Sequence, residues 1–397
     1  MGVMARLRRL WLDVHLWIGV GLSIPIIILG ITGAVLVWHE DMERWLHPER
    51  HAVSEGAMLT PSAYFAAADE AFGDAFAVTQ IRMPEEAGEP VVANARAKGR
   101  PPEGQRPETR TAWLDPPTGN VLAIANPRAE MFGIMHVLHG SLMIPDIGRK
   151  VVGWIGWAMT ISCITGIWLW WPRNNAILKA LRWRRSPSTN FNLHHMIGFW
   201  IAIPLAVLSL TGVYISFPQT ARAWTAAFVQ MSPQREGQGG GGPRGGAAPM
   251  LRIQTDADAV AQAALALTPG GELALIARPT QARGEGPPPA WRVGVRVEGE
   301  EQPINISVAD ATGAAKLPEP RAEAAGDGVP MLMRRIHDGV GMGIVWQTII
   351  FVGGIGPVIL AVTGFVMWMR RRARRRALKH GPDAELPQDA KAAENAA

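Results

Sequence analysis

Four long apolar stretches alternate with polar regions along the chain and predict four membrane-spanning helices. They cover residues 14–38, 151–172, 192–217 and 343–369, and none of them contains an acidic or basic residue. Each is close to the ~20 residues that cross a hydrocarbon core of roughly 30 Å. The first stretch is too long for a secretory signal, and no small-x-small cleavage site follows it. We therefore expect it to be retained as a helix.

Basic residues flank the apolar stretches on one side of the predicted membrane. Three arginines lie in segment 1–13, five basic residues and no acid lie in the connector 173–191, and seven basic residues open the tail 370–397. Because basic loops stay in the cytoplasm, both termini are expected inside a bacterial inner membrane. The net charge of +5 is thus distributed as in a lipid-embedded protein, and nucleic acid is not an expected partner.

The two long loops, 39–150 and 218–342, are then exported, and both predict small α+β units. PSAYFAAADEAF and DADAVAQAALAL predict short helices, whereas TAWLDPPTGNVLAI and INISVADATGAAKL predict strand–turn–strand units. The segments KGRPPEGQRP, EGQGGGGPRGGAAP and RGEGPPP are rich in turn residues and are expected to be mobile insertions. The expected fold is a membrane all-α four-helix bundle, built from two parallel-related two-helix repeats, with two small exported α+β units.

An internal repeat relates the two halves of the chain. The first and third stretches align at an offset of 179, and the second and fourth at an offset of 198. Two helices per half keep the halves in the same orientation, so the implied symmetry axis runs along the membrane normal. The aligned pairs are Gly19/Gly198, Pro25/Pro204, Thr32/Thr211, Gly33/Gly212, Thr165/Thr363 and Gly166/Gly364.

The repeat divides the ten histidines into those kept in both halves and those that are not. His15 falls on His194 and His139 falls on His337. A single histidine at a helix end is as well explained as a polar residue at the headgroup level. Two that face each other across a pseudo-twofold axis can instead bind opposite faces of one haem iron. We expect one pair at the cytoplasmic edge, His15 with His194, and the other at the exported edge.

The neighbourhood of these histidines adds weaker expectations. Gly19 and Gly33 lie near the azimuth of His15 and would let a macrocycle approach, although small residues equally serve helix packing. The single cysteine, Cys163, excludes an internal disulfide and a thiolate cluster, and we expect it to be a packing residue. Secondary candidates for ligation, shielding or propionate binding are His195, His136, His39, Arg334 and Arg335.

At this point the residues resemble the PepSY-associated transmembrane helix family, which includes membrane-bound ferric-siderophore reductases. The motifs that carry the resemblance are LDVHLWIGVGLSIPIIILGITGAVLVWHEDMERWLHP, VLHGSLMIPDIGRKVVGWIGWAMTISCITGIWLWWPR, FNLHHMIGFW and RIHDGVGMG…AVTGFVMWMRR. The resemblance implies a four-helix membrane protein with two b-type haems, which passes electrons to ferric chelates in the periplasm. His15, His194, His139 and His337 occupy the family's histidine positions.

Three functions follow as hypotheses. The first is a di-haem b oxidoreductase that reduces a ferric siderophore in the periplasm. Because no flavin or nicotinamide fingerprint is present, its electrons would come from quinol or a separate cytoplasmic reductase. The second is a membrane-anchored module that binds a peptide or a protease. The third is an iron-chelate transporter, which ought to show broken helices or polar residues at mid-membrane depth.

Overall fold

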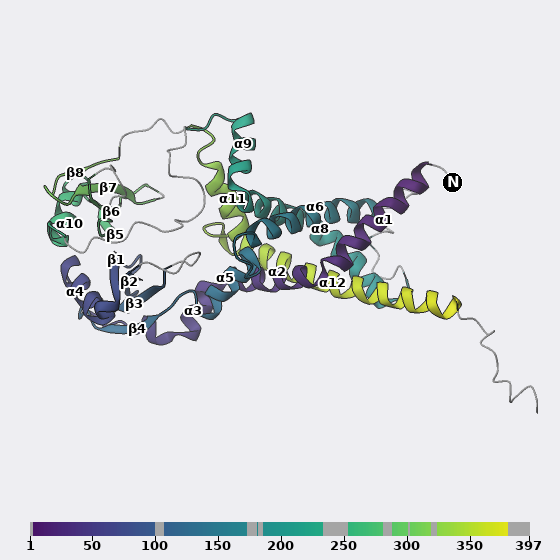
Figure 1. Cartoon of the computed structure of the whole chain (residues 1–397), viewed down its shortest axis with the longest axis horizontal. Coiled ribbons are helices and arrows are strands. Elements are labelled where there is room, and N and C mark those ends of the chain that lie inside the picture. The colour runs from purple at the N-terminus through teal and green to yellow at the C-terminus, as the bar shows by residue number, and fades with distance from the viewer. Residues whose placement is uncertain are drawn as a thin grey trace, which may run out of the picture. The chain divides into compact units, whose positions relative to one another are not determined.

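The structure is a computed structural model that divides into two units (Figure 1). It describes residues 3–99, 107–172, 181, 186–232, 253–280, 288–300, 302–318 and 324–379. The helical unit comprises Met1–Val37, Met135–Gln230 and Gly326–Ala397, and the sheet unit comprises Trp38–Ile134 and Met231–Ala325. Most of each predicted low-complexity insertion, and all five basic residues of the connector, lie outside the described residues.

Among the described residues, the helical unit contains five long helices and shorter ones between them. The long helices are α1 (Val3–Gly21), α2 (Ser23–Leu36), α6 (Gly148–Trp170), α8 (Thr189–Ser216) and α12 (Gly343–Lys379). The short ones are α5 (Met131–Ser141), α9 (Pro218–Phe228) and α11 (Val329–Asp338). Helix α6 packs against α1 and α8, and α12 packs against α2 and α8.

Among the described residues, three helices are long and apolar enough to cross a membrane, namely α6, α8 and α12. Helices α1 and α2 pass the same test together, but they are bent by 66° at a break. The sequence predicted one continuous helix here, and the chain instead leaves the helical conformation at Leu22, with φ −106° and ψ 11°. Pro25 has no N–H for the carbonyl of Gly21, so the break lies where a proline opens a helix. The equivalent Pro204 lies inside the unbroken α8.

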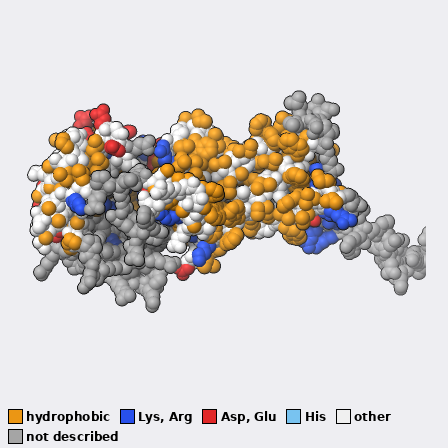
Figure 2. Space-filling view, turned by 90° about the horizontal axis from the view of Figure 1, so that it is seen from above, with side chains coloured by type: hydrophobic (Ala, Val, Ile, Leu, Met, Phe, Trp, Pro, Cys, Tyr) orange, Lys and Arg blue, Asp and Glu red, His pale blue; other side chains and the backbone are white. Residues whose placement is uncertain are grey.

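Many large apolar side chains of the helical unit point outward, and several small or polar ones, such as Ser23, Thr32 and Thr211, are buried. Figure 2 shows the resulting hydrophobic belt, with Lys and Arg side chains beyond its ends. Ile24, Trp154 and Ile203 are 71%, 67% and 69% exposed. A Cβ on Gly30 would lie 2.5 Å from the carbonyl oxygen of Gly354, so α2 and α12 cross in close contact. Membrane helices pack through such small residues while lipid covers the large ones.

The sheet unit contains one antiparallel sheet in the order β4-β3-β2-β1-β5-β6-β7-β8. The first four strands are β1 (Phe76–Arg82), β2 (Val91–Ala97), β3 (Thr109–Leu114) and β4 (Val121–Ala125). The second four are β5 (Glu272–Ala277), β6 (Ala290–Arg296), β7 (Ile304–Ala309) and β8 (Ala315–Lys316). The unit also contains α3 (His39–Leu46), α4 (Pro61–Phe72), α10 (Ala257–Ala266) and the 3₁₀ helices η1 (Pro48–His51) and η2 (Gly73–Ala75).

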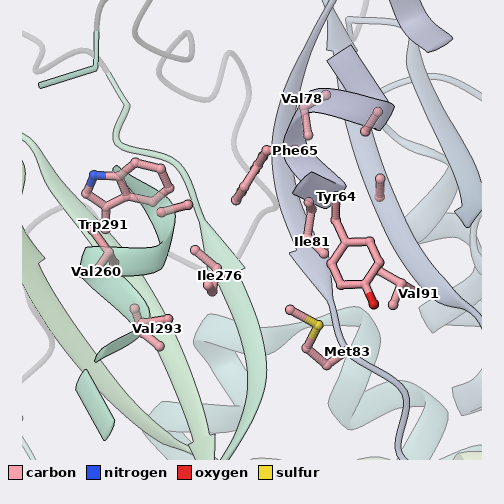
Figure 3. Close-up of a cluster of buried hydrophobic side chains, with 14 of the residues drawn as sticks. Tyr64, Phe65, Val78, Ile81, Met83, Val91, Val260, Ile276, Trp291 and Val293 are labelled. Carbon is pink, nitrogen blue, oxygen red and sulfur yellow. The ribbon is translucent and has the colours of Figure 1, made fainter. Parts of the chain in front are cut away.

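The two predicted α+β units share this sheet rather than standing apart. Strands β1 and β5 pair antiparallel, with Ile81 opposite Ile276, and both side chains are fully buried. Two separate sheets would each have left one of these strands as an unpaired edge. Figure 3 shows side chains of the common core, among them Tyr64, Phe65 and Trp291. The predicted short helices and strand–turn–strand units are present as α4, α10, β3–β4 and β7–β8.

Asp115 organises the turn between β3 and β4. Its carboxylate accepts hydrogen bonds from the Ser54 N–H, at 2.7 Å, and from Thr118 Oγ1, at 2.6 Å. The hydroxyl of Thr118 and the N–H of Ser54 hold the pKa of the Asp115 carboxyl below its ordinary value. Because the folded pKa is the lower one, the ionised group stabilises the fold above the unfolded pKa, and that stability is lost as the pH falls below about 4.

We expect Asp115→Asn to destabilise the β3–β4 hairpin by about 1–3 kcal/mol, because a buried acceptor is replaced by an amide that satisfies only part of these donors. Hydrogen exchange of the β3 and β4 amides in the intact protein measures this. Asp74→Asn is the matched control, since Asp74 is exposed. Equal exchange in the two variants at neutral pH would show that the turn does not depend on this carboxylate.

Candidate functional site

Two pairs of imidazoles face each other within the helical unit. The ring centres of His15 and His194 are 6.2 Å apart, with an angle of 88° between the ring planes. Those of His139 and His337 are 6.1 Å apart, with an angle of 49°. Each pair takes one histidine from each half of the internal repeat. The structure thus brings together the same histidines that the repeat grouped.

Each imidazole is held through Nδ1 by a helix of its own half. His15 contacts α6, His194 contacts α12, His139 contacts α2 and His337 contacts α8. His15 Nδ1 lies 3.1 Å from both the Ser162 carbonyl oxygen and Thr165 Oγ1. His139 Nδ1 lies 3.0 Å from the Leu29 carbonyl oxygen and 3.1 Å from Thr32 Oγ1. His337 Nδ1 lies 3.1 Å from the Leu208 carbonyl oxygen and 3.0 Å from Thr211 Oγ1. His194 Nδ1 lies 3.0 Å from Thr363 Oγ1.

The threonines determine which nitrogen of the ring carries the proton. Each threonine hydroxyl donates to the carbonyl four residues before it, as Thr32 does to Ile28 and Thr211 to Val207. The hydroxyl oxygen is then an acceptor toward the imidazole, as a carbonyl always is. Nδ1 must therefore be the protonated nitrogen, which leaves the Nε2 lone pair available to a metal.

The glycine that follows each threonine lies directly under the ring. A Cβ on Gly33 would lie 2.8 Å from His139 Cε1, and a Cβ on Gly212 would lie 3.1 Å from His337 Cε1. Gly166 and Gly364 stand in the same relation to His15 and His194, at 3.3 and 3.2 Å. The expectation that Gly33 serves His15 is therefore wrong, because Gly33 contacts His139. We call each threonine–glycine pair with its contacts a histidine seat.

The histidine seats are functional residues that the sequence reasoning missed. The threonines and glycines entered it only as markers of the repeat or as small packing residues. A signal was present, since the dipeptide Thr-Gly occurs once in each of the four apolar stretches. What the sequence did not show is that each dipeptide packs against a histidine from another helix.

The spacing of the pairs fits a shared metal. Two imidazoles bound to one metal ion at about 2.0–2.1 Å from each nitrogen have ring centres roughly 6.3 Å apart. In the described part of the chain, the Nε2 atoms of these four histidines make no hydrogen bond. They are also not fully buried, whereas the side-chain nitrogens of Arg50, Trp170 and Arg278 that lack a partner are. No cluster of three or more His, Cys, Asp or Glu side chains occurs among the same residues. Paired imidazoles alone suit haem, which brings its own equatorial nitrogens.

His139 and His337 lie on the short helices α5 and α11, outside the long membrane helices. Burial, and after it the neighbouring His337, lower the pKa of His139 to about 4. Burial likewise lowers the pKa of His337 to about 4. Both imidazoles are therefore neutral at neutral pH, which is the form that ligates a metal.

The secondary candidates take no part in either pair. The ring of His195 stacks between Phe191 and Trp170, with ring centres 5.6 and 5.9 Å away. His136 is exposed, and the ring of His39 packs on Phe132. Arg334 lies 3.9 Å from the carboxylate of Asp338, and Arg335 donates to the carbonyl of Gly341. Cys163 is buried beside Ile201 and Leu205, as expected of a packing residue.

Helix α8 connects the two pairs. It carries His194 of one pair, and 17 residues later it carries Thr211, which holds His337 of the other pair. Seventeen residues of helix span about 25 Å. The two pairs are thus separated by most of the length of a membrane-crossing helix.

The family model described as the PepSY-associated TM region matches residues 12–371. The match includes both halves of the repeat and all four paired histidines. No curated protein matches the chain.

We expect Gly33→Ala to destabilise the helical unit by about 1–3 kcal/mol through overpacking, because the new methyl group meets His139. The midpoint of thermal unfolding in detergent measures it. Gly19→Ala is the matched control, since nothing lies within 4 Å of a Cβ there. If both variants unfolded at the same temperature, close packing of Gly33 against His139 would not contribute to the stability of the helical unit.

Proposed function

Because the chain belongs to the family of the PepSY-associated TM region, we propose that it is a di-haem b membrane oxidoreductase of the bacterial inner membrane. In this proposal it carries electrons from the cytoplasmic side to the periplasm and reduces a ferric siderophore or related ferric chelate there. The observation that carries the proposal is the pair of bis-imidazole arrangements, with ring centres 6.2 and 6.1 Å apart.

His15 and His194 would hold one haem, and His139 and His337 would hold the other. The threonines of the histidine seats keep each imidazole in the tautomer that presents Nε2. When bound, haem would supply one-electron chemistry. The chain would contribute the four imidazoles that hold it and a surrounding of apolar helices, and these are the features by which a protein tunes a haem potential.

The direction of transfer follows from charge and composition. The basic segments support a cytoplasmic position for both termini and the connector, and the pair formed by His139 and His337 would then lie toward the periplasm. The sequence contains no nucleotide fingerprint. Electrons would accordingly enter from quinol or from a separate cytoplasmic reductase, near His15 and His194.

One observation favours chelate transport as a second function. The break between α1 and α2 resembles the discontinuous helices of transporters. The nearest polar side chain, Ser23, is buried and donates its hydroxyl to the carbonyl of Val20. Its hydroxyl is therefore already engaged by the last turn of α1, across the break, which favours the oxidoreductase. A membrane anchor for a peptide- or protease-binding module would not need four imidazoles arranged in pairs.

Alanine substitutions test the pairing. We expect His15→Ala and His194→Ala to remove the same component of the dithionite-reduced difference spectrum, and His139→Ala and His337→Ala to remove the other. Each haem needs both of its axial ligands. His136→Ala, at an exposed position one turn before His139, is the control and should keep both components. Loss of one shared component by His15→Ala and His139→Ala would refute the assignment.

Reoxidation tests the acceptor. Protein reduced in vesicles should be reoxidised by an added ferric siderophore and not by its gallium complex, because Ga(III) has the same charge and coordination but accepts no electron. His139→Ala should slow this reoxidation strongly, since it removes a ligand on the exported side. A stopped-flow record of the haem absorbance gives the rate. Equal rates with the iron and gallium complexes would exclude chelate reduction.

A further inference from the structure

Helices α4 and α10 cover one face of the sheet. On the opposite face, which we call the open face, η1 lies against the β3–β4 end, with Arg50 over the ring of Trp113, whereas β1 and β6 carry exposed arginines. Helices α4 and α10 pack against the strands on the covered side, where the common core lies. Side chains alternate between the two faces along a strand. Ile81, Val293 and Val295 are fully buried in the core, so Arg82, Arg292 and Arg296 belong to the open face.

The strand register brings these three arginines together. Arg82 on β1 is opposite Leu275 on β5, which is opposite Gly294 on β6. Two strand spacings therefore separate Arg82 from Gly294, which is about 10 Å. Arg292 and Arg296 lie two residues to either side of Gly294 on the same strand. The three arginines thus surround Leu275 and Gly294, and Gly294 is buried against Leu275 and Pro303.

The charge of this face is one-sided. The eight described strands contain six basic residues, of which Arg110 lies on the covered face, and one acid, Glu272, which is opposite Arg296 on the open face. Arg82 and Arg292 are exposed, and within the described ranges neither has an ion-pair or hydrogen-bond partner. Arg296, which is opposite Glu272 in the strand register, donates to the carbonyls of Pro84 and Leu273.

Arginines on the other face of the same sheet are treated differently. Arg278, which follows β5, makes a two-fold ion pair with Asp69 of α4 and lies over the ring of Phe65. Arg110 on β3 pairs with Glu108. The carboxylates thus meet the arginines that the fold itself uses. Arg82 and Arg292 of the open face meet no such carboxylate among the described residues.

We propose that Arg82, Arg292 and Arg296 bind the anionic groups of the ferric chelate, which makes the acceptor a polyanion such as a tris-catecholate or polycarboxylate complex. This inference rests on the proposed function, since it names the class of its substrate. Guanidinium groups recognise carboxylate and catecholate oxygens with paired hydrogen bonds.

A lipid surface suits this face less well. Insertion into a membrane interface needs exposed aromatic or aliphatic side chains beside the basic ones. The row that contains Arg292 instead continues through Ala277, Gln80 and Asn94 on one side and Ser307 on the other. These polar and small side chains favour a soluble, hydrogen-bonding anion.

Binding of redox-inert complexes to the full chain in nanodiscs tests the proposal. The probes are a trianionic gallium tris-catecholate and a monocationic gallium trihydroxamate, measured by equilibrium dialysis. We expect the dissociation constant of the trianion to rise about tenfold for Arg82→Gln or Arg292→Gln and about a hundredfold for both. Arg110→Gln is the matched control and should leave the dissociation constant of the trianion unchanged. Arg82→Gln and Arg292→Gln should leave the dissociation constant of the cation unchanged.

The inference is overturned if the trianion binds the double variant as it binds the native chain, or if both probes bind the native chain equally. It is also overturned if the double variant loses only its binding to anionic vesicles or to an acidic peptide. Because gallium accepts no electron, these results are independent of the redox proposal. If the chain binds the trianion through these arginines but is not reoxidised by the iron complex, the binding site is supported and the proposed function is contradicted.

Discussion

The hydrogen bonds at Nδ1 of the four paired histidines are the interaction on which the rest of the helical unit depends. An imidazole N–H among apolar helices costs about 1–3 kcal/mol if it has no acceptor, and the helix carbonyls and threonine oxygens supply one. The same bonds set the tautomer and the direction of each ring. Without these hydrogen bonds, the two imidazoles of a pair could lie at the same ring-centre distance, 6.2 or 6.1 Å, with no fixed tautomer or ring direction.

The internal repeat duplicates these hydrogen-bonded histidines and so produces two pairs. Each histidine is held by a helix of its own half, and it meets its mate only across the junction of the halves. Both halves must therefore be folded and docked before either pair exists. Helix α8 then separates the pairs by about 25 Å, a spacing that suits transfer of charge across the membrane in steps.

The sequence predicted local structure better than long-range contacts. Hydrophobic patterning located the membrane helices, and turn residues located the two hairpins, because both signals lie within one segment. The break at Leu22 did not follow in this way, since Pro25 breaks its helix whereas the equivalent Pro204 does not. The joining of β1 to β5 depends on strands nearly 200 residues apart, which no local pattern reports. The repeat grouped the histidines correctly, but their partners at Nδ1 required the packed helices.

Haem content with its ligation spectrum tests the central claim most directly. The purified chain should contain two haems per polypeptide by pyridine haemochrome, and near-infrared magnetic circular dichroism of the oxidised protein should show the charge-transfer band of bis-imidazole ligation. A chain that folds, inserts in the membrane and binds no haem under iron-replete, haem-replete expression would contradict the account, as would haem with any other axial ligand pair.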